Sequence, residues 1–384
     1  MRRICVVTGS RAEYGLLSRL MRMIAGSERT CLQLIATNMH LSPAYGETYK
    51  EIEADGFRID RKIPILEPGR NDAVATLRAM ARALAGFADA FRELGPDLVL
   101  LLGDRYEMLA AAQAALVGRI PIAHIHGGEI TEGAYDDAIR HAITKMSHLH
   151  FTSTERYRQR VIQLGEPPER VFHVGSLGVE QIRKLPLLSR EELASAIGFE
   201  VGPGCLLVTC HPATLGSGPS EIGELLAALD ERPDLRIVFT LPNSDNGSRE
   251  IAEAIRAFVR RHAARAAAFE SLGLTRYLSA MKYCGAVVGN SSSGILEAPS
   301  FGRPTLDIGD RQRGRIAAES VVHCPADRQA ILAGLDQVLS APFAARCATT
   351  ANPYEKAHTA AAIFRQISTY PLDGIIDKHF YDIV

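Results

Sequence analysis

The sequence lacks the features of a membrane protein, a secreted protein or a polyanion-binding protein. It has no apolar run of about 18 residues, so we expect no transmembrane helix. The first apolar run, Ile4–Val7, is too short for a signal peptide and is followed by no small-residue cleavage site. The 43 Lys and Arg residues nearly balance the 44 Asp and Glu residues, and the net charge of −1 gives no global field for nucleic acid or an anionic membrane. Any anionic ligand must therefore be bound by a local cluster of side chains.

The seven cysteines form neither a C-x-x-C pair nor the His/Cys spacing of a zinc site. An odd number of cysteines scattered among apolar runs is typical of buried thiols in a reducing compartment. We therefore expect a cytoplasmic protein that needs neither a disulfide nor a metal to fold.

The length of 384 residues predicts two or three domains, and 47% hydrophobic against 23% charged residues excludes disorder as the main state. Short, continuous apolar runs alternate with longer helical patterns, which indicates parallel strands covered by helices on both faces. The first array has expected strands at 4–8, 32–37, 98–102, 120–126, 150–153 and 171–174 and expected helices at 15–25, 73–94, 106–117 and 136–146. The second array has expected strands at 205–210, 236–240, 268–270, 286–289 and 305–308.

The stretch 184–204, which carries no strand signal, separates the two arrays. We therefore predict an α/β fold of two Rossmann-like, doubly wound domains with a hinge near residues 180–200. Such sheets bind ligands at the carboxyl ends of their strands, so two facing domains would form a cleft. The fold alone does not identify a reaction.

The common catalytic signatures G-x-G-x-x-G, G-x-x-x-x-G-K-[ST], G-x-S-x-G and H-E-x-x-H are also absent. Polar residues instead gather just after the expected strands. After the first strand, residues 8–15 (TGSRAEYG) combine small residues, the start of a helix and Arg11. This pattern suits an anion, and it is equally typical of an ordinary strand-to-helix turn.

Two further clusters in the first half carry carboxylates. Asp104, directly after the strand 98–102, is either an acid–base residue or the N-cap of the next helix. The segment 124–141 begins with HIHGGE and continues with Asp136-Asp137 and Arg140-His141. One helical turn separates Asp136 from Arg140 and Asp137 from His141, so each pair shares a helix face. Ordinary ion pairs on a capped helix do not account for the whole group, and we favour a catalytic interpretation.

The second half carries groups suited to a nucleotide diphosphate. His211 lies at the end of the first strand of the second array, where a lone histidine is more often structural. The motif GNSSSG (289–294) offers three hydroxyl groups at a helix N-terminus, and Glu297, one turn into that helix, is suited to the hydroxyls of a ribose. Residues 309–315 (GDRQRGR) place three arginines in one loop, which predicts a local anion site. We therefore predict that the second domain binds a nucleotide handle and that the first domain acts on the attached group.

Taken together, the motifs TGSRAEYG, GDRYE, HIHGGE, DDAIRHAITKMSHLHF, HPAT, GNSSSGILE and GDRQRGR resemble those of the hydrolysing UDP-N-acetylglucosamine 2-epimerases of sialic and legionaminic acid biosynthesis. The resemblance runs in unbroken order from residue 3 to about residue 317, and GNSSSGILE and HGGE are its most specific parts. It implies a glycosyltransferase-B type fold with domains over 1–182 and 183–359 and a C-terminal helix, about 360–384, that packs back on the first domain.

The family reaction converts UDP-N-acetylglucosamine and water to UDP and N-acetylmannosamine through a 2-acetamidoglucal. The resemblance implies a homo-oligomer, dimeric or tetrameric, that needs no metal or other cofactor and no nucleic acid or membrane partner. Its motif positions imply catalytic roles for Asp104, Glu129, Asp136 and His126. The positions implied for UDP binding are Arg11, Arg105, His211, Ser291, Ser292, Glu297 and Arg311.

One departure leaves a role open. Several relatives have a catalytic glutamate where this chain has His126. Either His126 acts as the acid–base group, or Glu129 supplies the carboxylate with His126 as its support; we favour Glu129. The HIHGGE pattern also occurs in relatives that act on UDP-N,N'-diacetylbacillosamine, so the substrate sugar stays open.

Three alternatives share parts of this pattern. A glycosyltransferase would use the same fold and nucleotide site but would need an acceptor, and a non-hydrolysing epimerase would keep UDP on its product. A UDP-sugar sensor without activity is disfavoured by the intact Asp104, Glu129 and Asp136, because carboxylates repel a pyrophosphate. We therefore expect a hydrolysing 2-epimerase.

Overall fold

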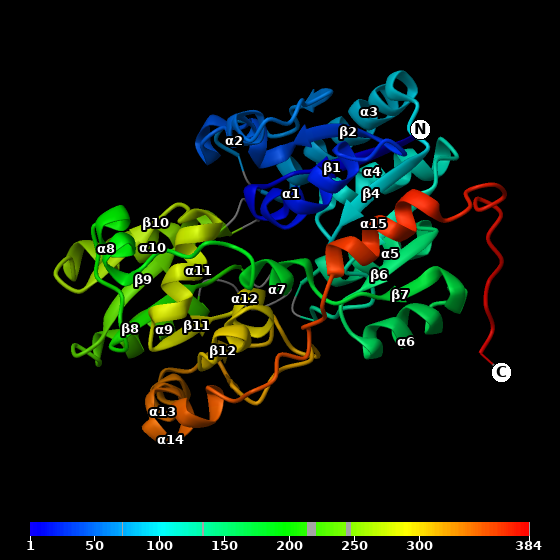
Figure 1. The fold of residues 1–384 in the computed structure, drawn as a ribbon. Helices are drawn as coiled ribbons and strands as arrows, with labels where there is room; N and C mark the ends of the chain where they lie inside the picture. Colours follow the sequence, from blue (N-terminus) through cyan, green and yellow to red (C-terminus); the bar gives the residue numbers. More distant parts are fainter. Residues whose placement is uncertain (71, 133, 213–219, 243–246, 384) are drawn as a thin grey trace. The chain divides into compact units, whose positions relative to one another are not determined.

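A computed structural model describes residues 1–383 except 71, 133, 213–219 and 243–246 (Figure 1). The chain divides into two compact units. Unit 1 comprises Met1–Glu129, Asp136–Glu180 and Tyr354–Val384, and unit 2 comprises Ile130–Tyr135 and Gln181–Pro353.

Unit 1 is built on a seven-stranded sheet in which every pairing is parallel. In spatial order its strands are β3 (Arg61–Ile63), β2 (Thr30–Thr37), β1 (Arg2–Thr8), β4 (Leu98–Leu102), β5 (Ile122–Ile125), β6 (Leu149–Thr152) and β7 (Val171–His173). Its helices are α1 (Arg11–Ala25), α2 (Tyr49–Ala54), α3 (Ala73–Leu94), α4 (Tyr106–Val117), α5 (Asp136–Met146), α6 (Glu155–Gln163) and α15 (Thr359–Thr369), with the short η1 (Asn38–Leu41), η2 (Pro43–Tyr45) and η3 (Pro168–Arg170). Helix α7 (Leu177–Ile182) spans the boundary between the units.

Unit 2 repeats this plan with a six-stranded, fully parallel sheet. In spatial order its strands are β10 (Ala266–Phe269), β9 (Arg236–Thr240), β8 (Cys205–Thr209), β11 (Ala286–Gly289), β12 (Thr305–Ile308) and β13 (Val321–Cys324). Its helices are α8 (Arg190–Ile197), α9 (Ser220–Asp230), α10 (Ser248–Arg261), α11 (Gly273–Tyr283), α12 (Ser292–Leu296), α13 (Arg328–Leu339) and α14 (Ala341–Cys347), with η4 (Ala298–Phe301). The predicted fold of two Rossmann-like, doubly wound units is confirmed.

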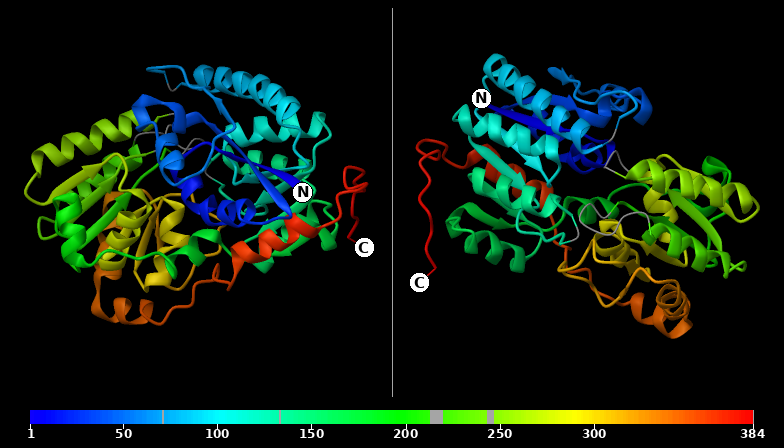
Figure 2. Two further views of the ribbon diagram at one scale, coloured as in Figure 1. Left: turned by 45° about the horizontal axis from the view of Figure 1, so that its top comes forward. Right: turned by 180° about the vertical axis from the view of Figure 1, so that it is seen from behind.

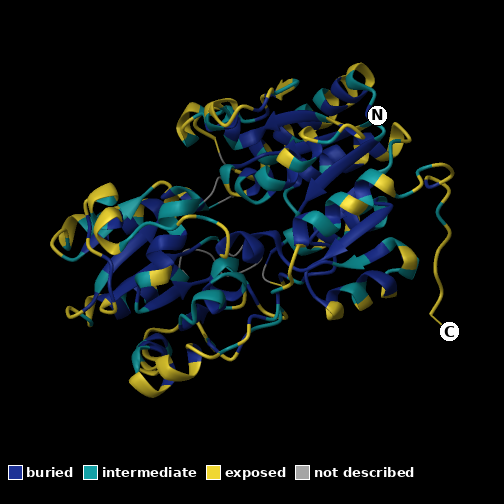
Figure 3. Cartoon of the chain, viewed as in Figure 1, coloured by how far each residue is buried: buried dark blue, intermediate teal, exposed yellow. Residues whose placement is uncertain are grey.

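Both faces of each sheet are buried, as continuous apolar strands require. Along β1, Ile4 and Val6 belong to one core cluster and Cys5 and Val7 to another, because successive side chains point to opposite faces. The central strands of both sheets are accordingly among the most buried parts of the chain (Figure 3). Within the described residues, no helix combines the length and hydrophobicity needed to cross a membrane.

Most expected elements are present, and the differences have local causes. The helices 73–94, 106–117 and 136–146 have the predicted bounds. The strand expected over 120–126 is shorter, since His126 has a left-handed backbone with φ of 68° and β5 ends at Ile125. Strands β3 and β13 were not predicted; β3 begins with two exposed charged residues and therefore has no apolar run.

The C-terminal segment returns to unit 1. Helix α15 lies beside α1 (Figures 1 and 2), and its Ala360, Ile363 and Ile367 share a core cluster with the buried face of α1. Glu180 accepts a hydrogen bond of 2.8 Å from the backbone amide of Ala360, so it satisfies a free donor at the start of α15.

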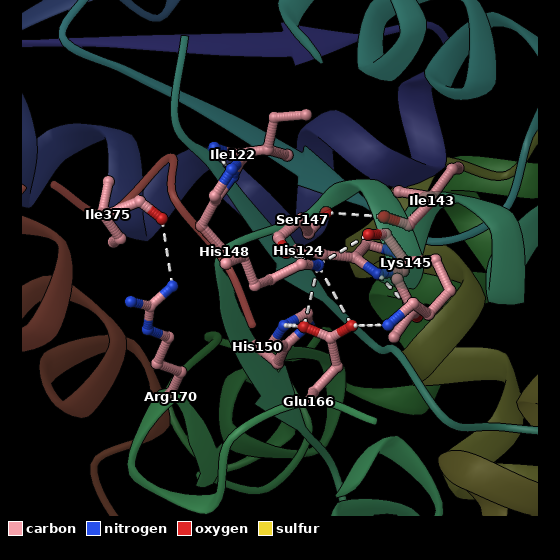
Figure 4. Close-up of polar contacts among 12 residues, drawn as sticks. Ile122, His124, Ile143, Lys145, Ser147, His148, His150, Glu166, Arg170 and Ile375 are labelled. Atoms are coloured by element: carbon pink, nitrogen blue, oxygen red, sulfur yellow. Dashed lines mark hydrogen bonds and ion pairs between the residues drawn. The ribbon is translucent and has the colours of Figure 1, made fainter. Parts of the chain in front are cut away.

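Beyond α15, a buried ion cluster holds the chain end against unit 1. The Glu166 carboxylate lies 2.7 Å from Nζ of Lys145, 2.9 Å from Nζ of Lys378 and 3.0 Å from Nε2 of His150. Figure 4 shows Lys145 and His150 on two sides of this carboxylate. Lys378 also donates to the backbone oxygens of Lys145 and Ser147. Burial alone would raise the pKa of Glu166, but the bonds and charges from these partners lower it to about 2.

Candidate functional site

In both sheets the strand order reverses beside the first strand of the unit. The reversal lies between β1 and β4 in unit 1 and between β8 and β11 in unit 2. Doubly wound sheets bind their ligands just outside the carboxyl ends of the strands at such a point. The predicted site residues follow these strands or their neighbours.

The turn after β1 encloses a buried carboxyl group. Ser10 caps α1 by accepting a hydrogen bond from the amide of Glu13, and the Glu13 carboxylate accepts one of 2.7 Å from the amide of Gly9. Burial, and then the neighbouring charge of Glu107, raise the pKa of Glu13 to about 8. A Cβ on Gly9 would lie 2.2 Å from Glu107 Oε1, so a side chain at this position would displace the buried Glu107 carboxyl group. Arg11 opens α1, with its Nε 2.8 Å from Glu51 Oε2.

Asp104, after β4, is paired with a buried arginine. Its carboxylate accepts a hydrogen bond from Arg140 of α5, whose side chain is 3% exposed. The alternative that Asp104 caps α4 is wrong, because Arg105 occupies the N-cap position and makes no side-chain capping bond. Arg105 instead donates from Nε to Oε1 of the fully buried Glu107 at 2.9 Å.

A neutral histidine is hydrogen-bonded to the turn that carries Asp104. His124 of β5 donates from Nε2 to the backbone oxygen of Gly103 at 2.7 Å, and its Nδ1 lies 3.2 Å from the Thr144 hydroxyl. Burial lowers the pKa of His124 to about 3, so the ring stays uncharged and can donate from one nitrogen only. The residue before Asp104 is therefore held by a contact across the β4–β5 pair.

The HGGE turn after β5 joins the two residues whose roles were left open. His126 Nδ1 lies 3.1 Å from Glu129 Oε1, and Ser153 donates to the same oxygen at 2.7 Å. His126 and Glu129 are 8% and 2% exposed. Gly128 has φ of 77°, and a Cβ there would lie 2.5 Å from the backbone oxygen of Tyr157, so glycine is required.

Asp136 and Asp137 open α5, as predicted. The expected pairing of Asp137 with His141 is present, with Oδ2 3.6 Å from Nε2. Burial lowers the pKa of His141, although the Asp137 charge opposes that shift. Asp136 belongs to unit 1, as Asp104, His126 and Glu129 do.

In unit 2, Asn290 after β11 organises the loop that carries His211. The Asn290 side chain accepts from the amide of His211 at 2.7 Å and donates to its carbonyl at 2.8 Å. The Asn290 carbonyl accepts from Arg311 at 3.1 Å and from Gln312 at 2.8 Å. His211 lies two residues beyond β8, and the next motif residues, Ala213 and Thr214, lie outside the described residues.

The serines of GNSSSG open α12 and form part of a chain of hydroxyl groups. Ser291 is the N-cap and accepts from the amide of Ser293, and Ser292 is the first helical residue. The Ser293 hydroxyl lies 3.1 Å from that of Ser291 and 2.5 Å from the hydroxyl of Tyr277 in α11.

Glu297 differs from its expected position. It lies at the C-cap of the five-residue α12 rather than one turn into a longer helix. Burial raises the pKa of Glu297 to about 7, so this carboxyl group changes charge near neutral pH.

The predicted residues divide between the two units. Unit 1 contains Arg11, Asp104, Arg105, His126, Glu129 and Asp136, and unit 2 contains His211, Ser291, Ser292, Glu297 and Arg311. Sequence reasoning missed the supporting roles of Arg140, Ser153, Tyr277 and Asn290. Arg140 and Asn290 stand inside quoted motifs, but Ser153 and Tyr277 carry no sequence signal. Among the described residues, no group of three or more His, Cys, Asp or Glu side chains is arranged to hold a metal ion.

Comparisons with known proteins find relatives over most of the chain. Residues 22–368 match the family described as UDP-N-acetylglucosamine 2-epimerase. The chain is 44% identical over 323 residues to the Campylobacter jejuni GDP/UDP-N,N'-diacetylbacillosamine 2-epimerase (hydrolyzing), covering 84% of each chain. It is 40% identical to the Escherichia coli polysialic acid biosynthesis protein P7, over 100% of this chain and 98% of that protein. It is 36% identical to the Legionella pneumophila UDP-N,N'-diacetylbacillosamine 2-epimerase (hydrolyzing), over 98% of both.

Solved structures support the fold. The Neisseria meningitidis UDP-GlcNAc 2-epimerase bound to UDP-GlcNAc matches with a TM-score of 0.78 at 20% identity, over 95% of this chain and 99% of that chain. Glycyrrhiza uralensis UGT73P12, a GT-B glycosyltransferase, matches with a TM-score of 0.62 at 11% identity, over 98% and 96% of the two chains. Both units therefore have the sheet architecture of glycosyltransferase-B type enzymes.

Proposed function

Because this chain belongs to the UDP-N-acetylglucosamine 2-epimerase family, we propose that it is a hydrolysing 2-epimerase whose substrate is UDP-N,N'-diacetylbacillosamine. The relatives of this chain are UDP-sugar 2-epimerases, so it is an enzyme. One observation carries the choice of sugar: two relatives that are 44% and 36% identical to this chain over the aligned residues are named for diacetylbacillosamine.

The proposed reaction has two steps. A base removes the C2 proton, the C1–O bond breaks with its electron pair on departing UDP, and a C1=C2 double bond forms. A proton then adds to C2 from the opposite face and water adds to C1, which gives the free manno-configured sugar. The first step needs a positioned base and a means of neutralising UDP, and the second needs another acid–base pair.

The groups of unit 1 suit the acid–base chemistry. Asp104 is the base for the C2 proton, since the ion pair with Arg140 holds its carboxylate in place. Asp136 takes the proton of the attacking water. His126 and Glu129, bound to one another, supply the remaining acid–base function.

The groups of unit 2 suit the nucleotide. Ser291, Ser292 and the helix start offer donors to the diphosphate, and Arg311 adds positive charge near them. His211, fixed by Asn290, is a further phosphate ligand, and Glu297 accepts from the ribose hydroxyls. Arg11 and Arg105 are the cations of unit 1 proposed for the same ligand.

UDP-N-acetylglucosamine is the second candidate substrate. It is supported by the family description and by the structural neighbour that was solved with UDP-GlcNAc. The two sugars differ at C4 and C6, away from the reacting carbons. A site that hydrogen-bonds a 6-hydroxyl group would discriminate strongly against the deoxy sugar.

A proton NMR time course in D2O with each sugar nucleotide tests both parts of the proposal. We expect UDP and a free manno-configured sugar with deuterium at C2 from UDP-N,N'-diacetylbacillosamine, and little turnover of UDP-N-acetylglucosamine. The reverse preference would change only the substrate. Consumption of neither, while UDP still binds, would overturn the proposed reaction.

The family resemblance also implies a homo-oligomer of two or four subunits and a cytoplasmic location. Both stay predictions. Light scattering on the purified full chain would give the number of subunits directly.

A further inference from the structure

The backbone of His126 has an unfavourable conformation for a residue with a side chain. Its φ of 68° lies in the left-handed region, which glycine adopts at no steric cost. The two residues that follow it, Gly127 and Gly128, are glycines. Residues in this conformation persist only where the surrounding structure holds them, and they cluster at active sites and ligand-binding sites.

Only one of the two ring nitrogens of His126 has a partner among the described residues. Its Nδ1 is 3.1 Å from Glu129 Oε1, whereas its Nε2 is buried and has no hydrogen-bond partner among the described residues. The residue is 8% exposed, so water does not freely solvate the ring. A buried nitrogen left without a partner is unfavourable, and such exceptions in a native protein call for a functional explanation.

The contacts determine which nitrogen carries the proton. An ionised carboxylate can only accept, so Nδ1 is the donor to Glu129, and Nε2 is the nitrogen that can take up or release a proton. Ser153 donates to the same Glu129 oxygen at 2.7 Å and so fixes the carboxylate. Glu129 is 2% exposed and accepts from two side chains of the protein. Because its Oε1 already has two side-chain partners, whereas Nε2 of His126 has none among the described residues, Glu129 is better placed to orient His126 than to act on a substrate.

We infer that Nε2 of His126 is the acid–base group of the water-addition step, with Glu129 and Ser153 as its positioning residues. This inference rests on the proposed function and refines it. The protonated imidazole gives its Nε2 proton to C2 of the unsaturated sugar, the oxygen of water bonds to C1, and Asp136 takes the proton that this water loses. The Glu129 carboxylate stabilises the imidazolium in the same way that the carboxylate of a catalytic triad does.

The strained backbone makes His126→Gly the decisive variant, since glycine removes the imidazole and also relieves the positive φ. We expect formation of the manno-configured sugar to fall by at least about 100-fold, the usual contribution of a general acid–base group. UDP release should fall less, so that unsaturated sugar accumulates, and added imidazole should restore part of the activity. UDP affinity and the melting temperature should change little, which a loss of structure would not allow.

The matched control is His358→Gly. His358 is an exposed histidine of unit 1 with φ of 63°, so the substitution relieves the same backbone conformation away from the proposed site. We expect full activity from this variant. No turnover of either sugar nucleotide by the wild type and this control would overturn the proposed function itself.

The companion variant Glu129→Gln distinguishes the two roles. Removing a positioning carboxylate should reduce activity less than removing the group that it orients. We therefore expect the loss of activity in Glu129→Gln to be about 10-fold smaller than that in His126→Gly. An equal or larger loss in Glu129→Gln would overturn the inference and make Glu129 the acid–base group. Sugar formation by His126→Gly within about threefold of the wild type would also overturn it.

Discussion

Asp104 combines a position after a buried strand with a buried ionic partner. The Arg140 guanidinium pairs with its carboxylate, and His124 holds the preceding Gly103 through its carbonyl oxygen. A charge-assisted bond to a side chain that is 3% exposed restricts both groups far more than a surface ion pair would. The carboxylate is thereby oriented before any substrate arrives.

Replacing Asp104 with asparagine tests this residue directly. Asp104→Asn keeps the size and an oxygen acceptor for Arg140 but loses the ability to take a proton. We expect turnover to fall by at least about 100-fold while UDP affinity stays nearly unchanged. Asp97→Asn, in an exposed pair with Arg3, is the control and should keep its activity. Equal losses of turnover and UDP affinity would contradict the division of roles between the units.

Glu297 predicts a pH dependence of nucleotide binding. Burial raises the pKa of Glu297 to about 7, and the ionised carboxylate accepts from both ribose hydroxyls more strongly than the neutral acid does. UDP affinity of the wild type should therefore rise between pH 6 and 8 more than that of Glu297→Gln, in which this group does not titrate. Comparing the two proteins by calorimetry cancels the titration of the phosphate itself. Parallel pH profiles would remove Glu297 from the nucleotide site.

At the scale of elements, contacts between neighbouring strands and helices fix the conformation of the loops in each unit. In unit 2, Gly289 has φ of 127° and a Cβ there would lie 2.1 Å from the Thr209 backbone oxygen. The close approach of β11 to β8 therefore requires glycine, and it brings Asn290 within reach of the His211 backbone. The loop geometry depends on this pair of strand ends.

Tyr277 positions the serines of GNSSSG, because its hydroxyl group is linked to those of Ser293 and Ser291. Tyr277→Phe removes the contact of 2.5 Å to Ser293 but keeps the ring. We expect UDP affinity to fall about 5-fold, the equivalent of one hydrogen bond near 1 kcal/mol, with little change in kcat. Tyr283→Phe on the same helix removes a bond of 3.1 Å to the Leu188 carbonyl and should leave UDP affinity unchanged. A change of similar size in both variants would assign the effect to the helix.

At the scale of the whole molecule, the chain end is part of the structure of unit 1. Lys378 reaches the buried Glu166, Arg170 donates to the Ile375 carbonyl at 3.0 Å, and the Tyr381 amide donates to the Gly165 carbonyl at 3.0 Å. These contacts join the last residues to segments more than 200 positions earlier in the sequence.

Lys378→Met should therefore destabilise the protein at neutral pH by about 3 kcal/mol, because it breaks a buried ion pair. The control, Lys356→Met, removes an exposed lysine and should cost little. The pKa of Glu166 is lowered to about 2 from 4.5, so the ion cluster stabilises the protein above about pH 4.5 and loses this effect as the pH falls toward 2. The difference between the wild type and Lys378→Met in urea unfolding should shrink over that range; a constant difference would contradict the role of Glu166.

The sequence by itself determined the fold class, most strand positions and the family. Continuous apolar runs, glycine-bounded turns and helix caps are local signals, and GNSSSG and HGGE are contiguous motifs, so each can be recognised without knowing what lies beside it. The short edge strand β3 was not predicted, because two of its three residues are charged and exposed.

Only the tertiary structure decided how the side chains are paired. Arg140 meets Asp104 from 36 positions away, Ser153 meets Glu129 from 24 positions away, and Lys378 meets Glu166 from 212 positions away. The left-handed conformation of His126, and its Nε2 without a partner in the described chain, likewise follow from the packing of strand ends. Such properties depend on burial and on distances through space, and no run of adjacent residues encodes them.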